Sequence, residues 1–304
     1  MFNVQRSTFK VRKAGTRNLK PGTWNPQRRA RGVTLIEMIV VIVITGIIGA
    51  IVALFVKRPV EGFVDAVRRA ELTDIADTAL RRITRDLRTA LPNSIRTTTS
   101  GNVKYIEYLQ TRGGGRYRAE KESDGTTGIP LDLTAAITQF DVIGTMPTLA
   151  SGDSVVIYNL TGDTTLAVAN AYEGDNRSAY SSNTSTTITI ASKQFPFASP
   201  GKRFQILQYP VTYACDPLSA GTGQLRRYCG YTPQRTPQPT PPTTPPTFPP
   251  GNDALLATNV TDCSFSYSTS GTNGRTGVVA LTLQVEQSNE KVRLFQQVHV
   301  SNVP

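Results

Sequence analysis

The sequence predicts an α+β protein in which one long N-terminal helix packs on an antiparallel β-sheet head. Three observations support this fold class. Residues 33–56 form one apolar run, residues 57–92 repeat apolar side chains at helical spacing, and from Val103 onward apolar and polar side chains alternate. Side chains repeat about every 3.6 residues in a helix and every second residue in a strand, so the two periods separate helix from sheet.

A strongly basic leader occupies residues 1–32. Nine of the 33 Lys and Arg residues lie in it, and it holds no Asp or Glu. The other 24 basic residues are nearly balanced by 22 acidic ones, so the formal net charge of +11 belongs mostly to the leader. A cationic surface for nucleic acid is therefore not predicted.

The apolar run at residues 33–56 is 24 residues long and contains one charge, Glu37. As a helix it would span about 36 Å, at about 1.5 Å per residue, which is enough to cross a membrane. The basic flank predicts that the leader stays in the cytoplasm and that the remainder is exported. A secretory signal would have a shorter apolar core and a cleavage site on its far side. A plain membrane anchor fits the length but does not explain Glu37, because a carboxylate in a membrane helix is costly unless it is paired.

A partner for Glu37 arises if the chain is cut between Gly32 and Val33. The new α-amine of Val33 then lies four residues from Glu37, which is about one helical turn. The two charges can neutralise each other within one chain or between staggered neighbours, and the second arrangement would fix the register of a helical bundle. The carboxylate also lies in the first turn, where the helix dipole favours a negative charge.

The segment Arg31-Gly32-Val33-Thr34-Leu35-Ile36-Glu37 resembles the signal of type IV prepilins. The resemblance implies that a dedicated prepilin peptidase cuts after Gly32 and methylates the new N-terminus at Val33, and that Glu37 acts in assembly and register. It also implies a type IV pilin-like fold. Val33 stands where the most familiar pilins have Phe, and the leader is longer than theirs.

Residues 57–92 predict an amphipathic helix that continues from the membrane segment. Apolar side chains from Val60 to Leu91 recur at helical spacing, with charged residues between them. Such a stripe faces a core, and the charges form a solvated face. Pro59 predicts a kink or short break at Arg58, and Pro92 predicts the end of the helix.

Residues 93–304 predict a β-rich globular head. The alternating pattern places its strands at Val103–Leu109, Ile137–Ile143, Ser154–Leu160, Thr186–Ile190 and Phe204–Cys215, and a hairpin at Gly277–Gln287 and Lys291–Val300. The polar segment 171–187 is expected to be a surface loop. Residues 233–250 hold nine prolines, which predicts a stiff polyproline loop on the surface, with a proline-rich ligand as the alternative.

Three longer segments resemble the MshO family of minor pilin-like proteins of the mannose-sensitive haemagglutinin (MSHA) pilus. They are Arg68–Arg96, Phe195–Pro217 and the ending His299–Pro304. The resemblance implies a low-abundance subunit in a priming or tip complex. Its implied partners are other minor pilins, the major pilin, the prepilin peptidase, the inner-membrane assembly platform and membrane lipid. The implied location is the bacterial inner membrane, single-pass with a periplasmic head, and then the pilus tip or base.

The three cysteines, Cys215, Cys229 and Cys263, all follow the membrane segment. Export would bring them to an oxidising compartment where a disulfide forms, and the residues alone leave three pairings open. The resemblance to the MshO family implies a Cys215–Cys263 bond with Cys229 free.

No catalytic constellation, metal site or cofactor site is predicted. His299 is the one histidine, and it lies in a predicted strand. Arg112–Arg116 lacks the helix and Lys-Ser/Thr pair of a phosphate loop and is expected to be a flexible turn. Glu173–Asn176 offers oxygen ligands but matches no full calcium loop.

The leading hypothesis is therefore a structural one: a minor pilin-like subunit that primes or caps filament assembly, with no enzymatic activity. One alternative is a tip adhesin that binds a ligand through its loops. Another is a minor pseudopilin of a type II secretion system, because the J-type minor pseudopilins share the plan of a helix and a sheet.

Overall fold

The computed structural model describes residues 32–163, 168–218, 223–233, 252–270 and 275–304. The predictions for the leader up to residue 31 and for residues 234–250 of the proline-rich loop lie outside these ranges. The chain divides into two compact units, Met1–Pro59 and Val60–Pro304, which are described separately below.

The N-terminal element is a single helix, α1, from Leu35 to Leu87. It continues through Pro59, so the expected break at Arg58 is absent. Proline removes one backbone donor, and a helix of 53 residues retains the hydrogen bonds on both sides of it. The helix ends before the predicted residue 92, because the backbone N–H of Thr89 bonds back to the carbonyl of Asp86 at 2.9 Å and the chain turns toward the sheet.

The described part of the head contains twelve strands. In chain order they are β1 (Arg96–Ser100), β2 (Val103–Tyr117), β3 (Ile137–Ile143), β4 (Ser154–Ile157), β5 (Arg177–Asn183), β6 (Thr187–Lys193), β7 (Arg203–Asp216), β8 (Gln224–Cys229), β9 (Asp253–Thr258), β10 (Val260–Ser270), β11 (Thr276–Gln287) and β12 (Glu290–Ser301). All their pairings are antiparallel.

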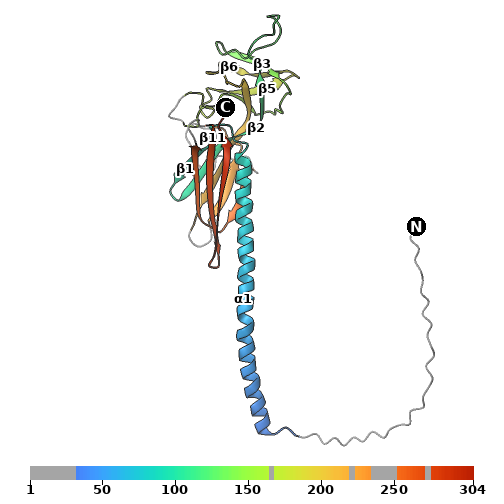
Figure 1. The fold of residues 1–304 in the computed structure, drawn as a ribbon, viewed down its shortest axis with the longest axis vertical. Coiled ribbons are helices and arrows are strands. Elements are labelled where there is room, and N and C mark those ends of the chain that lie inside the picture. Colours follow the sequence, from blue (N-terminus) through green and yellow to red (C-terminus); the bar gives the residue numbers. More distant parts are fainter. Residues whose placement is uncertain (1–31, 164–167, 219–222, 234–251, 271–274) are drawn as a thin grey trace, which may run out of the picture. The chain divides into compact units, whose positions relative to one another are not determined.

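Six of the strands close into a ring. The nine-stranded sheet has the order β1-β2-β3-β6-β5-β4-β7-β8-β9, and β2 also pairs with β7, so the ladder from β2 to β7 returns to its start. The inside of this ring is filled by an apolar core in which Phe140 and Phe204 meet edge to face, with ring centroids 5.4 Å apart. Figure 1 shows this lobe at the top, with β3, β5 and β6, and β2 running down from it.

The glycine run Gly113–Gly115 lies within β2, near its C-terminal end, so the flexible turn predicted there is wrong. A Cβ on Gly114 would lie 2.5 Å from the carbonyl oxygen of Phe204 on β7, and one on Gly115 would lie 2.9 Å from the Phe204 ring. The two strands approach more closely than any side chain would permit, and glycine is needed for that approach. The expected surface loop at 171–187 is also wrong in part, because β5 lies within it and pairs with β4 and β6.

The rest of the head, here called the lower lobe, contains a three-stranded sheet of β10, β11 and β12 together with the lower parts of β2, β7 and β8. The predicted hairpin is present as β11 and β12, joined at Ser288 and Asn289, which have φ values of 50° and 67°. Two consecutive residues with positive φ form the tight turn whose twist suits a hairpin. The apolar face predicted for β11 is buried, with Val279, Leu281 and Val285 at 0% exposure.

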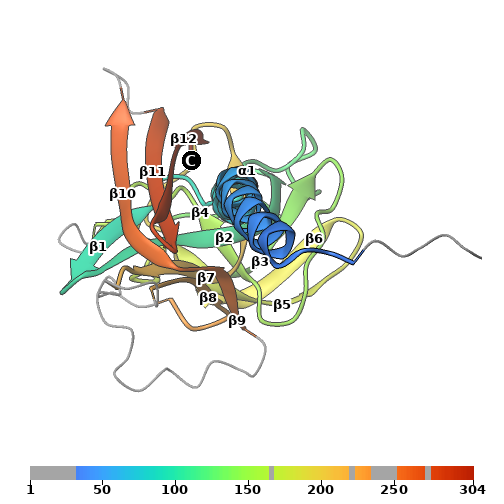
Figure 2. The same cartoon turned by 90° about the horizontal axis from the view of Figure 1, so that it is seen from below.

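The second half of α1 packs into this lobe. Its buried side chains form one core with the three-stranded sheet and with the lower parts of β2, β7 and β8: Leu72, Ala76, Ala79, Leu80, Ile83 and Leu87. In Figure 2, β10, β11 and β12 stand beside the helix. This is the α+β, pilin-like architecture that the sequence predicts, with the helix stripe laid on an antiparallel sheet.

Candidate processing and assembly site

The start of α1 is built by a helix cap at Thr34. Its Oγ1 accepts a hydrogen bond from the backbone N–H of Glu37 at 3.3 Å, and its carbonyl accepts one from the N–H of Met38 at 3.2 Å. Thr34 is thus the N-cap, and Glu37 is the third helical residue. Threonine followed three residues later by glutamate is the capping-box spacing, in which the hydroxyl satisfies an orphan donor of the first turn.

Gly32 and Val33 precede the cap and are not helical. Both are exposed, with Val33 at 64% exposure. The Gly32–Val33 peptide bond is therefore accessible, just outside the helix. The roles of Gly32, Val33 and Glu37 in cleavage, methylation and assembly remain predictions. The cap at Thr34 leaves Gly32 and Val33 outside the helix and places Glu37 in its first turn.

The described apolar residues of the membrane segment are exposed in the single chain. Ile42, Ile47 and Ile48 are 65%, 57% and 54% exposed, and at about 100° per residue they lie on three different sides of the helix. By length and composition α1 is apolar enough to cross a membrane. A helix that is apolar all round requires an apolar environment, and lipid or other apolar helices provide one.

Removing the Thr34 hydroxyl should weaken the first turn. Thr34→Ala is expected to cost about 1 kcal/mol of local stability, the usual cost of losing an N-cap. Hydrogen exchange of the amides of residues 36–38, measured in detergent micelles, should become about 5-fold faster. Thr34→Ser keeps the hydroxyl and should exchange as the wild type does. Equal protection in Thr34→Ala would contradict the cap.

A buried polar cluster joins the helix to the sheet. The carboxylate of Asp86, in the last turn of α1, accepts hydrogen bonds from Nε of Arg227 on β8 at 2.9 Å and from Oη of Tyr213 on β7 at 2.7 Å. Arg82 adds a bond at 3.2 Å. The Arg227 and Asp86 side chains are only 10% and 11% exposed. This ion pair fixes the rotation of the helix on the sheet.

The surroundings of Tyr213 and Arg227 raise the pKa of both side chains. Burial raises the pKa of Tyr213, and the Asp86 charge raises it further. Burial acts to lower the pKa of Arg227, but its neighbours Cys229, Tyr213 and Asp86 raise it overall. The tyrosine therefore stays neutral and the arginine stays charged at any physiological pH.

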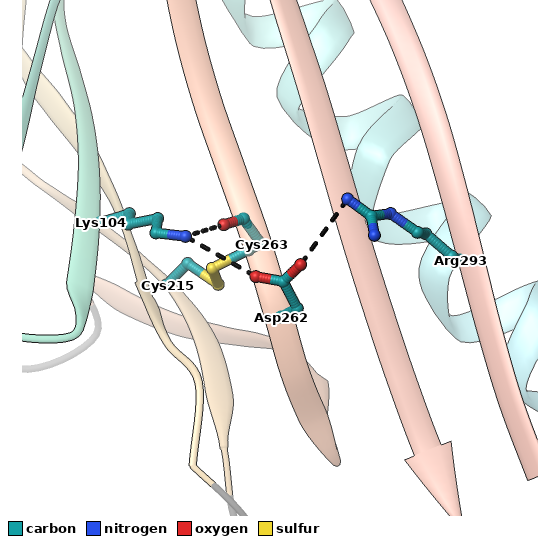
Figure 3. Close-up of a disulfide and its surroundings, with 5 residues drawn as sticks. All are labelled: Lys104, Cys215, Asp262, Cys263 and Arg293. Atoms are coloured by element: carbon teal, nitrogen blue, oxygen red, sulfur yellow. Dashed lines mark hydrogen bonds and ion pairs between the residues drawn. A yellow bond between two sulfur atoms is a disulfide. The ribbon is translucent and has the colours of Figure 1, made fainter.

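The structure contains the Cys215–Cys263 disulfide, the pairing that the resemblance implied, and Cys229 is free and buried. The bond joins β7 of the large sheet to β10 of the small sheet, as Figure 3 shows. Beside it, Nζ of Lys104 on β2 donates to the carbonyl of Cys263 at 2.5 Å and lies 3.6 Å from the Asp262 carboxylate. The disulfide and the lysine hold the two sheets together.

The remaining candidates from the sequence are dispersed. His299 is exposed on β12. Asp175 uses its carboxylate to accept the backbone N–H of Asn170 at 2.7 Å, which orders its own loop. Within the ranges that the structure describes, no group of three or more His, Cys, Asp or Glu is placed to hold a metal.

Sequence reasoning missed Thr34, Asp86 and Arg227. The Thr-x-x-Glu spacing was a readable signal for the cap. No local signal marks the other two, because Asp86 lies among many helix charges and its partner is 141 residues away.

Comparisons with known proteins support the N-terminal interpretation. Residues 27–53 match the family model for the prokaryotic N-terminal methylation motif. Neither a search of curated proteins nor a search of solved structures gave a match. The matched motif supports a subunit of the type IV pilin-like or pseudopilin class, associated with pilus or pseudopilus machinery, and the apolar helix fits the membrane anchor of such a subunit.

Proposed function

We propose that this chain is a minor pilin-like subunit of an MSHA-type pilus, which primes or caps filament assembly after cleavage between Gly32 and Val33. The observation that carries the proposal is the first turn of α1. There Thr34 caps the helix, and Glu37 is the one acidic residue of the apolar run that follows. Cleavage would place a new ammonium about one helical turn from that carboxylate.

The membrane and other pilin subunits are the proposed environments of the apolar helix. Before assembly, lipid of the inner membrane covers it, and the head lies in the periplasm. In the filament, the helices of the major pilin and other minor pilins cover it. The assembly platform and the prepilin peptidase act on the chain in between.

A second apolar surface supports association with other subunits. Beyond the membrane segment, the helix carries a group of apolar side chains that the head leaves 43–69% exposed: Val60, Phe63, Val64 and Val67. Contiguous exposed apolar side chains typically mark an interaction surface. Neighbouring pilin helices would bury this group together with the membrane segment.

Replacing Glu37 tests the proposal. Glu37→Ala should be cleaved and methylated like the wild type, because the Gly32–Val33 bond lies before the helix. Its incorporation into filaments should fall by about 10-fold or more, since a charged hydrogen-bonded pair in a water-poor environment is worth about 1.5 to 3 kcal/mol. Mass spectrometry of the mature N-terminus reads the processing, and quantitative immunoblotting of sheared filaments reads the incorporation.

Glu71→Ala is the matched control, because Glu71 is an exposed acid further along the same helix. It should be processed and incorporated normally. Wild-type incorporation of Glu37→Ala would contradict the role of the acid. A mature chain that begins at Met1 or beyond Val56 would contradict the whole proposal.

A deletion strain separates the pilus from the secretion alternative. Loss of filaments with normal protein secretion supports the minor pilin. Normal filaments with a secretion defect would instead indicate a minor pseudopilin. We assign no catalytic step to the head, and hydrolysis of an ester, glycan or phosphate substrate by the purified protein would contradict that.

A ligand-binding tip subunit is the second candidate function. A polar hollow of about 630 Å³, between the closed ring and the end of β8, favours it. Pockets of this size typically hold small ligands.

A further inference from the structure

The hollow is built around two arginines. Arg112 on β2 and Arg177 on β5 both line it, together with Gln208 and Tyr209 of β7. Arg112 is bound to the buried carboxylate of Asp153, at 2.9 Å from Nε and 3.4 Å from Nη2. The positive charge of Arg112 is therefore neutralised by the negative charge of Asp153.

Arg177 has no such partner. Every Asp and Glu of the sequence lies in the described ranges, and none of them forms an ion pair with Arg177 there. Its guanidinium also makes no side-chain hydrogen bond to the described part of the chain. Burial lowers the pKa of Arg177, and no nearby carboxylate offsets that effect. Among the described residues the Arg177 guanidinium has no acidic partner, so its donors are available to an anion in the hollow.

Irregularities in the sheet supply two of the lining side chains. In the β2–β7 ladder, Thr111 pairs with Leu207 and Gly113 pairs with Ile206, which leaves Arg112 outside the register. Gln110 pairs with Tyr209, which leaves Gln208 outside it on the other strand. Both residues that the ladder omits line the hollow. Bulges of this kind redirect side chains and are frequent beside binding sites.

Two tyrosines complete the wall. Tyr231 is held in place, because its hydroxyl donates to the Glu107 carboxylate at 2.8 Å and lies 2.5 Å from the Thr212 hydroxyl. Tyr231 and Tyr209 both line the hollow. Tyrosines beside hydrogen-bonding groups suit a ligand that is apolar on one face and polar at its edge, as a sugar ring is.

We propose that this hollow binds a saccharide that carries one carboxylate. Arg177 would pair with the carboxylate as a planar fork, Arg112 would add its free Nη1, and Gln208 would bind ring hydroxyls. The charges support one anionic group: Arg112 and Asp153 cancel, and Arg177 leaves one positive charge. A sugar also fits the volume, which a bare carboxylate would not fill.

This inference rests on the second candidate function and is tested on the full-length protein in detergent micelles. The probe is sodium glucuronate, titrated by saturation-transfer NMR, with glucose and acetate as comparison ligands. Glucuronate should bind with a dissociation constant on the order of 1 mM, typical of a small ligand with one strong contact. Glucose and acetate should each bind at least about 10-fold more weakly, because each lacks half of the recognised chemistry.

Arg177→Gln should weaken glucuronate binding by about 10-fold or more. Arg203→Gln is the matched control, because Arg203 is exposed on β7 and does not line the hollow. Gln208→Glu is a second variant that places a negative charge in the hollow and should weaken binding similarly. Near-ultraviolet circular dichroism verifies that each variant is folded.

Equal glucuronate binding by the wild type and both hollow variants would overturn the inference. Equal binding of glucose would show that the charge is not recognised, and equal binding of acetate would show that the sugar is not; either result overturns it. Filament counts keep this result separate from the assembly role, because Arg177→Gln should make normal numbers of filaments.

Discussion

Replacing Asp86 with alanine should lower the free energy of unfolding of the head by about 3 to 5 kcal/mol. The change leaves the Arg227 guanidinium buried without its carboxylate, and it leaves the Tyr213 hydroxyl without its acceptor. A buried charge that loses its partner is far more costly than the pair was beneficial. Urea unfolding, followed by the near-ultraviolet circular dichroism of tyrosine, measures the loss. All eleven tyrosines lie between Tyr105 and Tyr267, so this signal reports on the head.

Asp77→Ala is the matched control. Asp77 pairs with Arg81 one turn away at 2.5 Å, but the Asp77 and Arg81 side chains are 41% and 73% exposed. An exposed pair of this kind contributes about 0 to 1 kcal/mol. A second variant, Asp86→Ala with Arg227→Met, should recover much of the loss because it removes both charges. Equal losses in Asp86→Ala and Asp77→Ala would show that the buried pair does not hold the helix in place.

Replacing Cys215 and Cys263 with serine should destabilise the head by about 4 kcal/mol. The two cysteines are 48 residues apart, and the bond between them restricts the unfolded chain over that whole loop. The bond also ties β7, inside the large sheet, to β10, which otherwise joins the large sheet along the chain only through Asn259 after the edge strand β9. The same urea titration measures the effect.

Reduction provides an internal control for this prediction. The wild type treated with a reductant should unfold like the double serine variant, and the variant should not respond to the reductant. Cys229→Ser should cost much less, because serine can keep the contacts to Arg227 and to the Asn252 carbonyl. An unchanged unfolding midpoint in the double variant would contradict a structural role for the disulfide.

The sequence predicts the helix and the final hairpin well because both are local. The apolar run from Val33 to Val56 and the alternation in β11 and β12 appear within single windows of the chain. Local hydrophobic periodicity therefore identifies them without knowledge of distant partners.

The closed ring could not be predicted in the same way. It depends on the pairing of β2 with β7, whose residues are about a hundred positions apart in the chain. The glycines of β2 have the composition of a turn, and the proximity of Phe204 explains why Gly114 and Gly115 stand in a strand. β5 also could not be predicted from its own side chains, many of which are polar. It forms a strand through its pairing with β4 and β6.

The candidate sites also differ in whether they could be predicted from the sequence. The Gly32–Val33 junction and Glu37 follow from a contiguous motif, and Thr34 could have been identified by its spacing to Glu37. Arg177 and Gln208 are ordinary polar residues in the sequence. Their importance depends on a ladder irregularity and on the absence of a nearby acid, which are properties of the folded chain.

The two longest strands of the upper lobe have a mechanical consequence. β2 and β7 run without interruption from the closed ring into the lobe that holds the end of the helix. A pulling force on a ligand bound in the hollow would therefore be transmitted along the backbones of these two strands to the base of the head. Within the described residues these two strands, and no flexible linker, connect the upper lobe to the rest of the head, so tension would be transmitted stiffly and not absorbed by a hinge.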